Sequence, residues 1–318
     1  MCVGKSVKFV LAAMLFAASC ASAQAADLLK PYVLAATTTT GTVASVTDEV
    51  KAKLTGAGFK IVGSYSPFDG ANVIVVTNDV LLKAAASSDR GGYLAPERVT
   101  ITKQYGNGKG VAFNPANADI QVAFTNPVYW AAAYRVTADV SAVKAALVAA
   151  LGDKQEYGSF YDYKNGISAG DLKDYRYMIF MEEFTDPSDL GSFADHGAAV
   201  KAVEAGLAAH AGGTSEVYRI DIPGTQETVF GVALTQGCSA DAHIMKAVDM
   251  GPLHNTGYAP YEILVDGKHA EALYARFRIA ISYLGLPMVS NPTGGTFMDI
   301  MCAPHAIAHA LTAAAGKK

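Results

Sequence analysis

The chain has 318 residues, of which 51% are hydrophobic and 17% charged, so its composition is the opposite of that of a disordered protein. Its 25 basic residues against 29 acidic ones lack the basic excess of a nucleic-acid-binding protein. At roughly 150 residues per domain, the length predicts about two domains.

The first 23 residues have the pattern of a secretory signal peptide. Two lysines precede an apolar run from Phe9 to Ala18, and Ala21-Ser22-Ala23 supplies a small-residue cleavage site. The run is shorter than the roughly 20 residues of a membrane-spanning helix, and no later segment is uniformly apolar over such a length. We therefore expect a periplasmic or secreted protein with no integral membrane segment in its mature chain. Anchoring through a lipid on Cys20 is disfavoured, because Ala17 stands where a lipobox prefers Leu.

Residues 24–45 are expected to form a linker and residues 46–156 a first module. Val46–Ala57 has apolar residues at helical spacing, with Thr47 as its N-cap and Gly58 placed to end it. The other elements expected here are strands Ile61–Tyr65 and Asn72–Thr77, a helix Val80–Ala86, strands Arg98–Tyr105, Gly110–Asn114 and Asp119–Phe124, and an Ala-rich helix Val128–Ala150 broken near Thr137–Asp139.

Residues 157–195 are expected to be an aromatic connector with one strand-like stretch, Tyr175–Phe180, and residues 196–318 a second module. The elements expected in the second module are a helix Ala198–Ala211, strands Val217–Ile222 and Thr228–Leu234, a helix Ala240–Met250, strands Tyr261–Val265 and Ala275–Tyr283, and a helix Phe297–Ala315 that Pro304 interrupts. Helices mixed with antiparallel strands in this way are typical of an α+β fold.

The two modules share the order of their elements and the short polar, Gly- and Pro-containing segments that separate them. Thr77-Asn78-Asp79 and Thr235-Gln236-Gly237 each precede a helical stretch, and Gly92–Glu97 and Gly257–Glu262 each lead through a proline into a strand. We therefore predict two related modules, each a curved antiparallel sheet packed against helices.

These landmarks resemble a tandem copy of the bacterial domain of unknown function 302, over roughly 46–136 and 198–315. The resemblance rests on Val75–Asp79 and Leu234–Cys238 at a first motif, Pro96–Ile101 and Pro260–Val265 at a second, and Asn107-Gly108 and Asp266-Gly267 at a turn. Neither copy has the Asn-Pro of the first motif, only the second keeps a cysteine nearby, and residues 119–136 extend the first copy. The resemblance implies a β-α-β4-α fold like that of the TATA-binding protein, and no activity.

The histidines are distributed unevenly. All seven lie after residue 195, as do both cysteines of the mature chain, Cys238 and Cys302. His305 and His309 are four residues apart, so they would share one face of a helix. Cys302 precedes His305 by three residues and would lie near the same face. Cys238 forms a second cluster with His243 and Met245. Thiolate, imidazole and thioether ligands together would suit copper or zinc, so we name Cys238, His243, Cys302, His305 and His309 as candidate metal ligands.

Two other interpretations of these residues stay open. An oxidising compartment permits a disulfide between Cys238 and Cys302, and an oxidised pair cannot bind a metal as thiolates. Met and Cys on Ala-rich helices are also ordinary core residues.

An aromatic patch follows Asn126-Pro127. Tyr129, Trp130 and Tyr134 fall on one helical face, where they would either pack on a sheet or form the lip of a ligand groove. The tyrosines of the connector would likewise join the modules or line a cleft between them.

Motifs of enzymes are missing: the sequence has no Gly-x-Ser-x-Gly, P-loop, Gly-x-Gly-x-x-Gly or His-Glu-x-x-His. We therefore assign no catalytic residue and expect an exported, non-enzymatic binding or interaction protein, whose small-molecule or protein partner the sequence does not identify. A metal- or redox-handling protein that uses the second-module Cys/His/Met cluster is the alternative.

Overall fold

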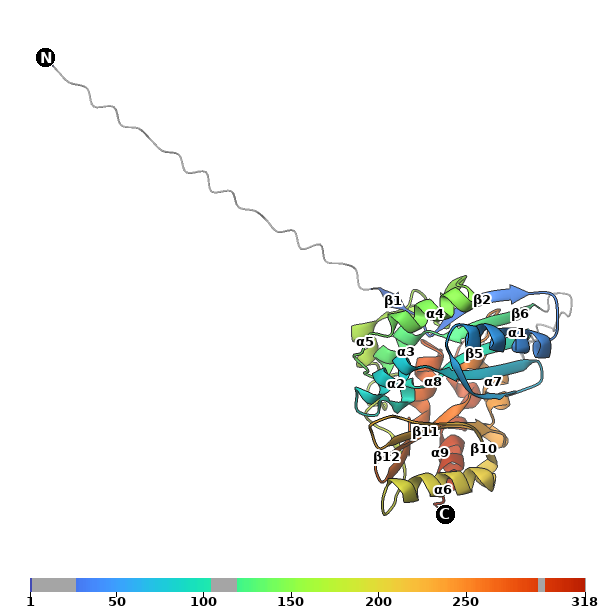
Figure 1. Ribbon diagram of the computed structural model, residues 1–318, viewed down its shortest axis with the longest axis vertical. Helices are drawn as coiled ribbons and strands as arrows, with labels where there is room; N and C mark the ends of the chain where they lie inside the picture. Colours follow the sequence, from blue (N-terminus) through green and yellow to red (C-terminus); the bar gives the residue numbers. More distant parts are fainter. Residues whose placement is uncertain (2–26, 104–118, 291–294, 318) are drawn as a thin grey trace.

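The computed structural model describes residues 1, 27–103, 119–290 and 295–317. The predicted signal peptide, the strand at 110–114 and the turn at 107–108 lie outside these residues. The fold is α+β, as predicted: every pairing between its strands is antiparallel, and helices cover the sheets in the described ranges. Figure 1 shows two main sheets with their helices, stacked with α4 at one end of the molecule and α6 at the other, beside the C-terminus; we use the names first and second module for these two sheets with their helices.

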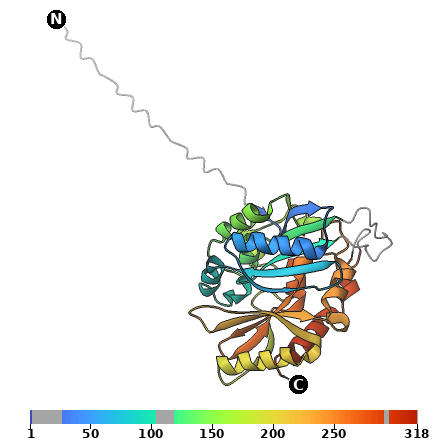
Figure 2. The ribbon, with the colours of Figure 1, turned by 45° about the vertical axis from the view of Figure 1, so that its right-hand side comes forward.

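The first sheet has the strand order β3-β4-β5-β6-β2-β7. Its strands are β2 (Tyr32–Thr38), β3 (Lys60–Tyr65), β4 (Ala71–Thr77), β5 (Glu97–Lys103), β6 (Ile120–Thr125) and β7 (Gln155–Tyr157). The accompanying helices are α1 (Val43–Gly56), α2 (Asp79–Ala86), the short 3-10 helix η1 (Gly91–Leu94), α3 (Pro127–Ala133) and α4 (Ser141–Leu151). Val46, Val50 and Leu54 of α1 are buried, and α1 lies across one face of this sheet (Figure 2).

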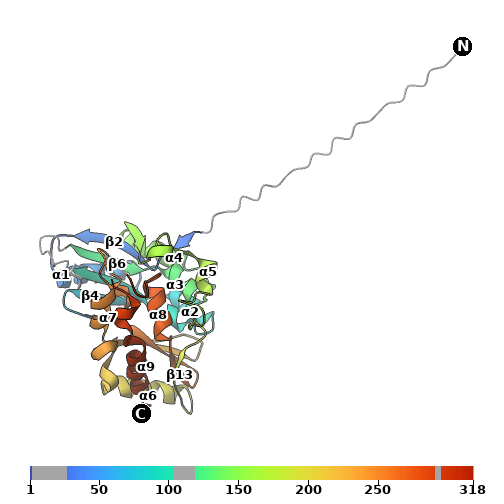
Figure 3. The same cartoon turned by 180° about the vertical axis from the view of Figure 1, so that it is seen from behind.

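The second sheet has the strand order β10-β11-β12-β13-β9. Its strands are β9 (Ser188–Ser192), β10 (Thr214–Asp221), β11 (Glu227–Leu234), β12 (Tyr261–Asp266) and β13 (His269–Ala272). Its helices are α6 (His196–Ala208), η4 (Ala211–Gly213), η5 (Gly237–Ser239), α7 (Asp241–Val248), η6 (Thr256–Tyr258), α8 (Ala275–Ser282), η7 (Phe297–Ile300) and α9 (Ala303–Ala314). Seen from behind, α8 lies in the middle of the molecule, next to α9 (Figure 3).

Several expected elements need correction. Residues assigned to the N-terminal linker form β1 (Leu28–Leu29) and the interior strand β2, and Thr42, not Thr47, caps α1 by accepting the Ser45 N–H at 3.1 Å. Tyr175–Phe180 is not a strand: the connector instead holds η3 (Tyr161–Tyr163), β8 (Ile167–Ser168), which pairs with β1, and α5 (Ala169–Lys173). At its end the connector supplies β9 to the second sheet.

The expected strand Ala275–Tyr283 is helix α8. Arg278 and Ser282 gave this segment an alternating apolar and polar pattern that mimics a half-exposed strand. In the structure both side chains are buried, because Arg278 donates to Glu262 at 3.2 Å and to the Ser282 hydroxyl. Only Arg276 of α8 is partly exposed, so the helix has almost no solvent face from which the sequence could reveal its period.

The second sheet is covered on both faces. Phe230, Val232 and Ile263 belong to the core that α6 and α9 close, whereas Val229, Tyr218 and Leu264 belong to the core of the first module. Neighbouring residues of a strand point to opposite faces of the sheet, so they belong to different cores. The first module is therefore the second layer over this sheet, and the surface between the modules is core rather than a surface cleft.

Buried charges lie at the centre of that surface. Arg98 of β5 forms an ion pair with Glu262 of β12, and Arg278 pairs with the second oxygen of the same carboxylate. The Arg278 guanidinium also lies 5.0 Å from the centroid of the Trp130 ring. Buried ion pairs of this kind need several partners to offset the loss of hydration.

Candidate metal and disulfide site

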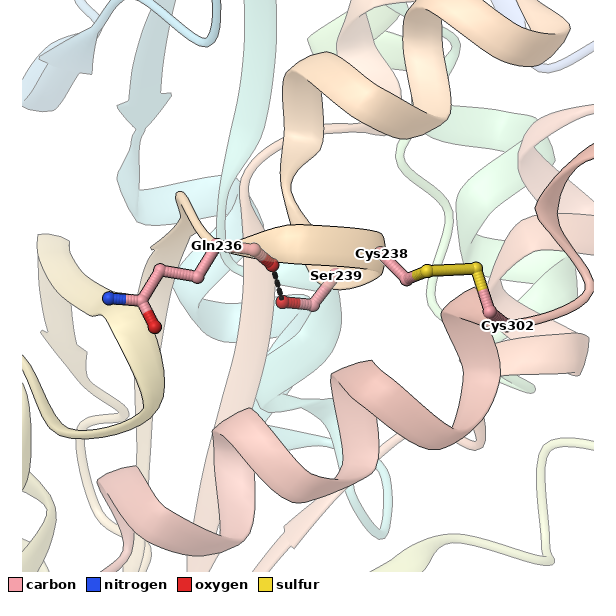
Figure 4. Close-up of a disulfide and its surroundings, with 4 residues drawn as sticks. All are labelled: Gln236, Cys238, Ser239 and Cys302. Carbon is pink, nitrogen blue, oxygen red and sulfur yellow. Dashed lines mark hydrogen bonds between the residues drawn. A yellow bond between two sulfur atoms is a disulfide. The ribbon is translucent and has the colours of Figure 1, made fainter.

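The structure joins Cys238 and Cys302 in a disulfide, with Cα atoms 5.8 Å apart (Figure 4). Cys238 lies in η5, directly after the interior strand β11, and Cys302 is the N-cap residue of α9. The disulfide interpretation of these two residues is therefore the one that the structure shows. The bridge connects the end of a sheet strand to the C-terminal helix of the same module.

Local hydrogen bonds fix Cys238. Thr235 donates both its N–H and its hydroxyl to the Gly213 carbonyl, at 3.0 and 2.8 Å, and Ser239 donates to the Gln236 carbonyl at 2.7 Å. Gly237 between them has φ of +54°, a conformation that favours glycine. The sequence Thr-Gln-Gly-Cys-Ser thus forms a tight turn that presents Cys238 at its outer side.

Cys302 is held by the turn before it and the helix after it. Thr296 and Asp299 cap η7 reciprocally, the Thr296 N–H donating to the Asp299 carboxylate at 2.8 Å. Pro304 then occupies the first turn of α9, where its missing N–H is not needed. The predicted interruption by Pro304 is therefore correct, and it is what separates η7 from α9.

His243 completes a compact group of donor atoms. Cys238 Sγ, Cys302 Sγ and a ring nitrogen of His243 all lie within 4.8 Å of one another. Cys238 is half-buried, while His243 and Cys302 are exposed. The first helical turn of α7 carries His243, whose N–H donates to the Ala240 carbonyl at 2.9 Å. The neighbouring elements η5 and α7, together with the distant helix α9, therefore bring two sulfurs and one imidazole together.

The other predicted ligands lie outside this group. His305 and His309 share the exposed face of α9, their ring centroids 4.6 Å apart, so their predicted helical pairing is confirmed. His309 and Cys238 line one surface hollow of about 490 Å³, together with Gln236. Met245 is fully buried in the second core and is not available as a ligand.

A buried carboxylate supports the helix that carries His243. Asp241 accepts the Leu234 N–H at 3.2 Å and the hydroxyl of Tyr65, from the first module, at 2.9 Å. Burial raises the pKa of Asp241 to about 7, although both hydrogen bonds act in the opposite direction. The sequence gives no indication of this contact, because Tyr65 and Asp241 are 176 residues apart.

The aromatic groove candidates are core residues. Tyr129, Trp130 and Tyr134 are 0, 2 and 1% exposed, so the expectation that they form the lip of a groove is corrected. Tyr129 donates its hydroxyl to the Ile281 carbonyl at 2.7 Å, and Trp130 donates to the Pro31 carbonyl at 3.0 Å. They join the first module to α8 and to the start of β2.

The oxidised and reduced forms of the site differ in chemistry. In the disulfide the sulfurs are poor ligands, whereas two thiolates and an imidazole form a set typical of zinc or copper. Zinc binds sulfur at about 2.3 Å and nitrogen at about 2.0–2.1 Å, so tetrahedral ligands lie about 3.8 Å apart. In this oxidised form the two sulfurs are bonded to each other, so reduction must let them separate to that spacing, while a ring nitrogen of His243 already lies within 4.8 Å of both.

Comparison with models of protein families found no match, and neither did searches of curated proteins and of solved structures. Among the described residues, no helix has both the length and the apolar character needed to cross a membrane. The assignment of a function therefore rests on the geometry of the chain itself.

Proposed function

We propose that this chain is an exported metal-binding protein that holds copper(I) or zinc through Cys238, His243 and Cys302 when the two cysteines are reduced. The observation that carries the proposal is the grouping of these three donor atoms within 4.8 Å. The proposal unites the two functions expected from the sequence, since the ligand of the binding protein is then the metal.

The packing of the elements that carry the three residues supports this function. Cys238 follows an interior strand, His243 lies on α7, and Cys302 begins α9, so each ligand belongs to an element packed on the second core. A preorganised ligand set needs little reorganisation to accept an ion. With three protein ligands, a fourth position is left for a water, a small ligand or a transfer partner.

The test is titration of the mature chain with zinc or copper(I), after reduction with a phosphine and its removal without air. We expect one ion per chain at micromolar or lower concentration, and an affinity at least tenfold weaker in Cys238→Ser, Cys302→Ser and His243→Ala. His269→Ala is the matched control, because His269 is an exposed histidine of the same module that contacts Ser192, outside the group. Equal binding by the wild type and the double Cys→Ser variant would refute the proposal.

Export by a signal peptide ending near Ala23 is part of the same proposal. The sequence pattern of residues 1–23 supports it, and the disulfide fits an oxidising compartment such as the periplasm. Determining the N-terminal residue of the protein recovered from the periplasm is the direct test. A mass that includes all 318 residues would contradict it.

We also propose that the two modules are copies of one unit, as the resemblance to the domain-of-unknown-function-302 family implies. Matched in chain order, β3-β4-β5-β6-β2 and β10-β11-β12-β13-β9 have the same strand order. A β-bulge falls at Val62 of β3 and at Val217 of β10, and another at Ala35 of β2 and at Leu190 of β9. Bulges at matched places support a common origin, because they are specific local features of a strand.

A further inference from the structure

We propose that the hollow beside Cys238 is a binding site for a low-molecular-weight thiol of the glutathione type, which opens the disulfide by attacking the sulfur of Cys238. This inference rests on the proposed function, because reduction is the step that would make the two cysteines available to a metal.

The hollow is lined by Cys238, the less exposed of the two cysteines. Its volume is about 490 Å³, and its lining includes Cys238 and not Cys302. The hollow is shallow and open to solvent, so a small peptide would lie along it and not inside it. Ala306, Ala310 and Ala313 of α9 form an apolar side, while Gln236 and His309 supply polar groups. A thiol-bearing peptide combines short apolar and polar parts in the same way.

The direction of attack decides which sulfur leaves. A thiolate held in the hollow forms its new bond to Cys238 Sγ, and the bond to Cys302 Sγ breaks. Cys302 leaves at the N-terminus of α9, where the helix dipole stabilises a negative charge even though Pro304 supplies no N–H in the first turn. The twelve-residue helix α9 thus favours this direction of cleavage over its reverse.

The complete reaction consumes two small thiols. The first thiolate forms a mixed disulfide with Cys238 and releases the Cys302 thiolate, which takes up the proton lost by that thiol. A second thiolate then attacks the small-molecule sulfur of the mixed disulfide and releases the Cys238 thiolate, which is protonated in turn. The products are two protein thiols and one small-molecule disulfide, so the two electrons that reduce the bridge come from the two small thiols.

The first test locates the mixed disulfide. The oxidised mature protein is mixed with glutathione, quenched with acid at intervals, digested and examined by mass spectrometry. We expect at least tenfold more glutathione on Cys238 than on Cys302. Equal labelling, preferential labelling of Cys302, or no labelling while glutathione reduces the bridge would each overturn the proposal.

The second test narrows the hollow. Ala306→Leu adds volume to its apolar side, and we expect the rate of reaction with glutathione to fall about tenfold. Ala308→Leu is the matched control, since Ala308 lies two residues further along α9 and does not line the hollow. An unchanged rate in Ala306→Leu would refute binding in the hollow.

A protein dithiol used in parallel distinguishes the source of the thiol. If the dithiol reduces the bridge faster than glutathione does, and Ala306→Leu leaves that rate unchanged, the reductant is a protein partner. That result would overturn the small-thiol proposal.

Neither readout involves a metal ion. Failure of metal binding by phosphine-reduced protein would remove the proposed function and leave the exchange chemistry measurable. Failure of the exchange would leave the metal titration unaffected.

Discussion

The Glu227 carboxylate accepts the backbone N–H of Gly92 at 2.7 Å, and this hydrogen bond joins the second sheet to η1 of the first module. Gly92 also has no room for a side chain, because a Cβ atom there would lie 2.7 Å from Leu264 Cδ1 and 2.9 Å from the Glu227 carboxylate. The contact between the modules therefore depends on the protonation of Glu227 and on the small size of the residue at position 92.

The stability of the folded chain should fall as the pH rises from about 5 to 8.5. Burial raises the pKa of Glu227 to about 7 and that of Glu97 to about 8, against an ordinary value of 4.5 for Glu. A carboxyl group whose pKa is higher in the folded state contributes stability below pH 4.5 and loses it as the pH passes through the folded value. Thermal unfolding measured across this range should show a shallower decline in the Glu97→Gln and Glu227→Gln variants. A slope identical to that of the wild type in both variants would contradict the prediction.

Gly92→Ala should destabilise the protein by about 1–3 kcal/mol, the range expected for overpacking a tight site. The added methyl group must push Leu264 or displace the Glu227 carboxylate. Urea unfolding of the variant measures the loss. Gly56→Ala is the matched control, because nothing lies within 4 Å of that position at the end of α1, and it should leave stability unchanged or slightly higher.

Removing one member of the central ion pair should be costly. Arg98→Met leaves Glu262 with Arg278 alone, and Glu262→Gln leaves two buried guanidinium groups without their shared carboxylate. We expect losses of about 3–5 kcal/mol, larger for Glu262→Gln, in equilibrium unfolding. Lys53→Met provides the comparison, because its pair with Glu49 is exposed on α1 and should contribute below about 0.5 kcal/mol. Similar losses in all three variants would show that burial does not set the effect.

Reduction of the disulfide should lower stability by about 2–4 kcal/mol, because the bridge closes a segment of 64 residues in the unfolded chain. The unfolding midpoint of the wild type should therefore drop when a phosphine is added. The Cys238→Ser/Cys302→Ser double variant should match the reduced protein and be insensitive to the phosphine. A phosphine effect that persists in the double variant would have another cause.

The sequence identified three residues of the second module that lie together, Cys238, His243 and Cys302, better than it predicted the module's interior. Cys238, His243 and Cys302 were identified because all seven histidines, and both cysteines beyond the predicted signal peptide, lie after residue 195. Their exact grouping, with His305 and His309 outside it, depends on how η5, α7 and α9 pack, and no local pattern encodes that packing. The α+β class and most element positions followed from apolar periodicity.

Two of the errors of prediction, at α8 and at the aromatic residues of α3, share one cause, which is burial of residues that have polar atoms. Arg278 is polar in the sequence and fully buried in the fold, so α8 looked like a strand. Trp130 and Tyr134 have polar atoms and follow a loop, so the lip of a ligand groove was one prediction for them. In the structure both side chains are buried. β2 was taken for a linker because its interior place in the sheet depends on β6 and β7, which come about 90 and 120 residues later.

Arg98 and Glu262 stand at matched places, each the second residue of the strand that follows an Ala-Pro pair, Ala95-Pro96 in one module and Ala259-Pro260 in the other. Under the proposed duplication, an ancestral homodimer of identical chains would have carried the same residue at both positions, and hence two like charges or none at its centre. Only after the gene was duplicated could the two positions diverge to opposite signs. The ion pair would then commit each half to the other, because either half produced alone would expose or bury a charge without its counterpart.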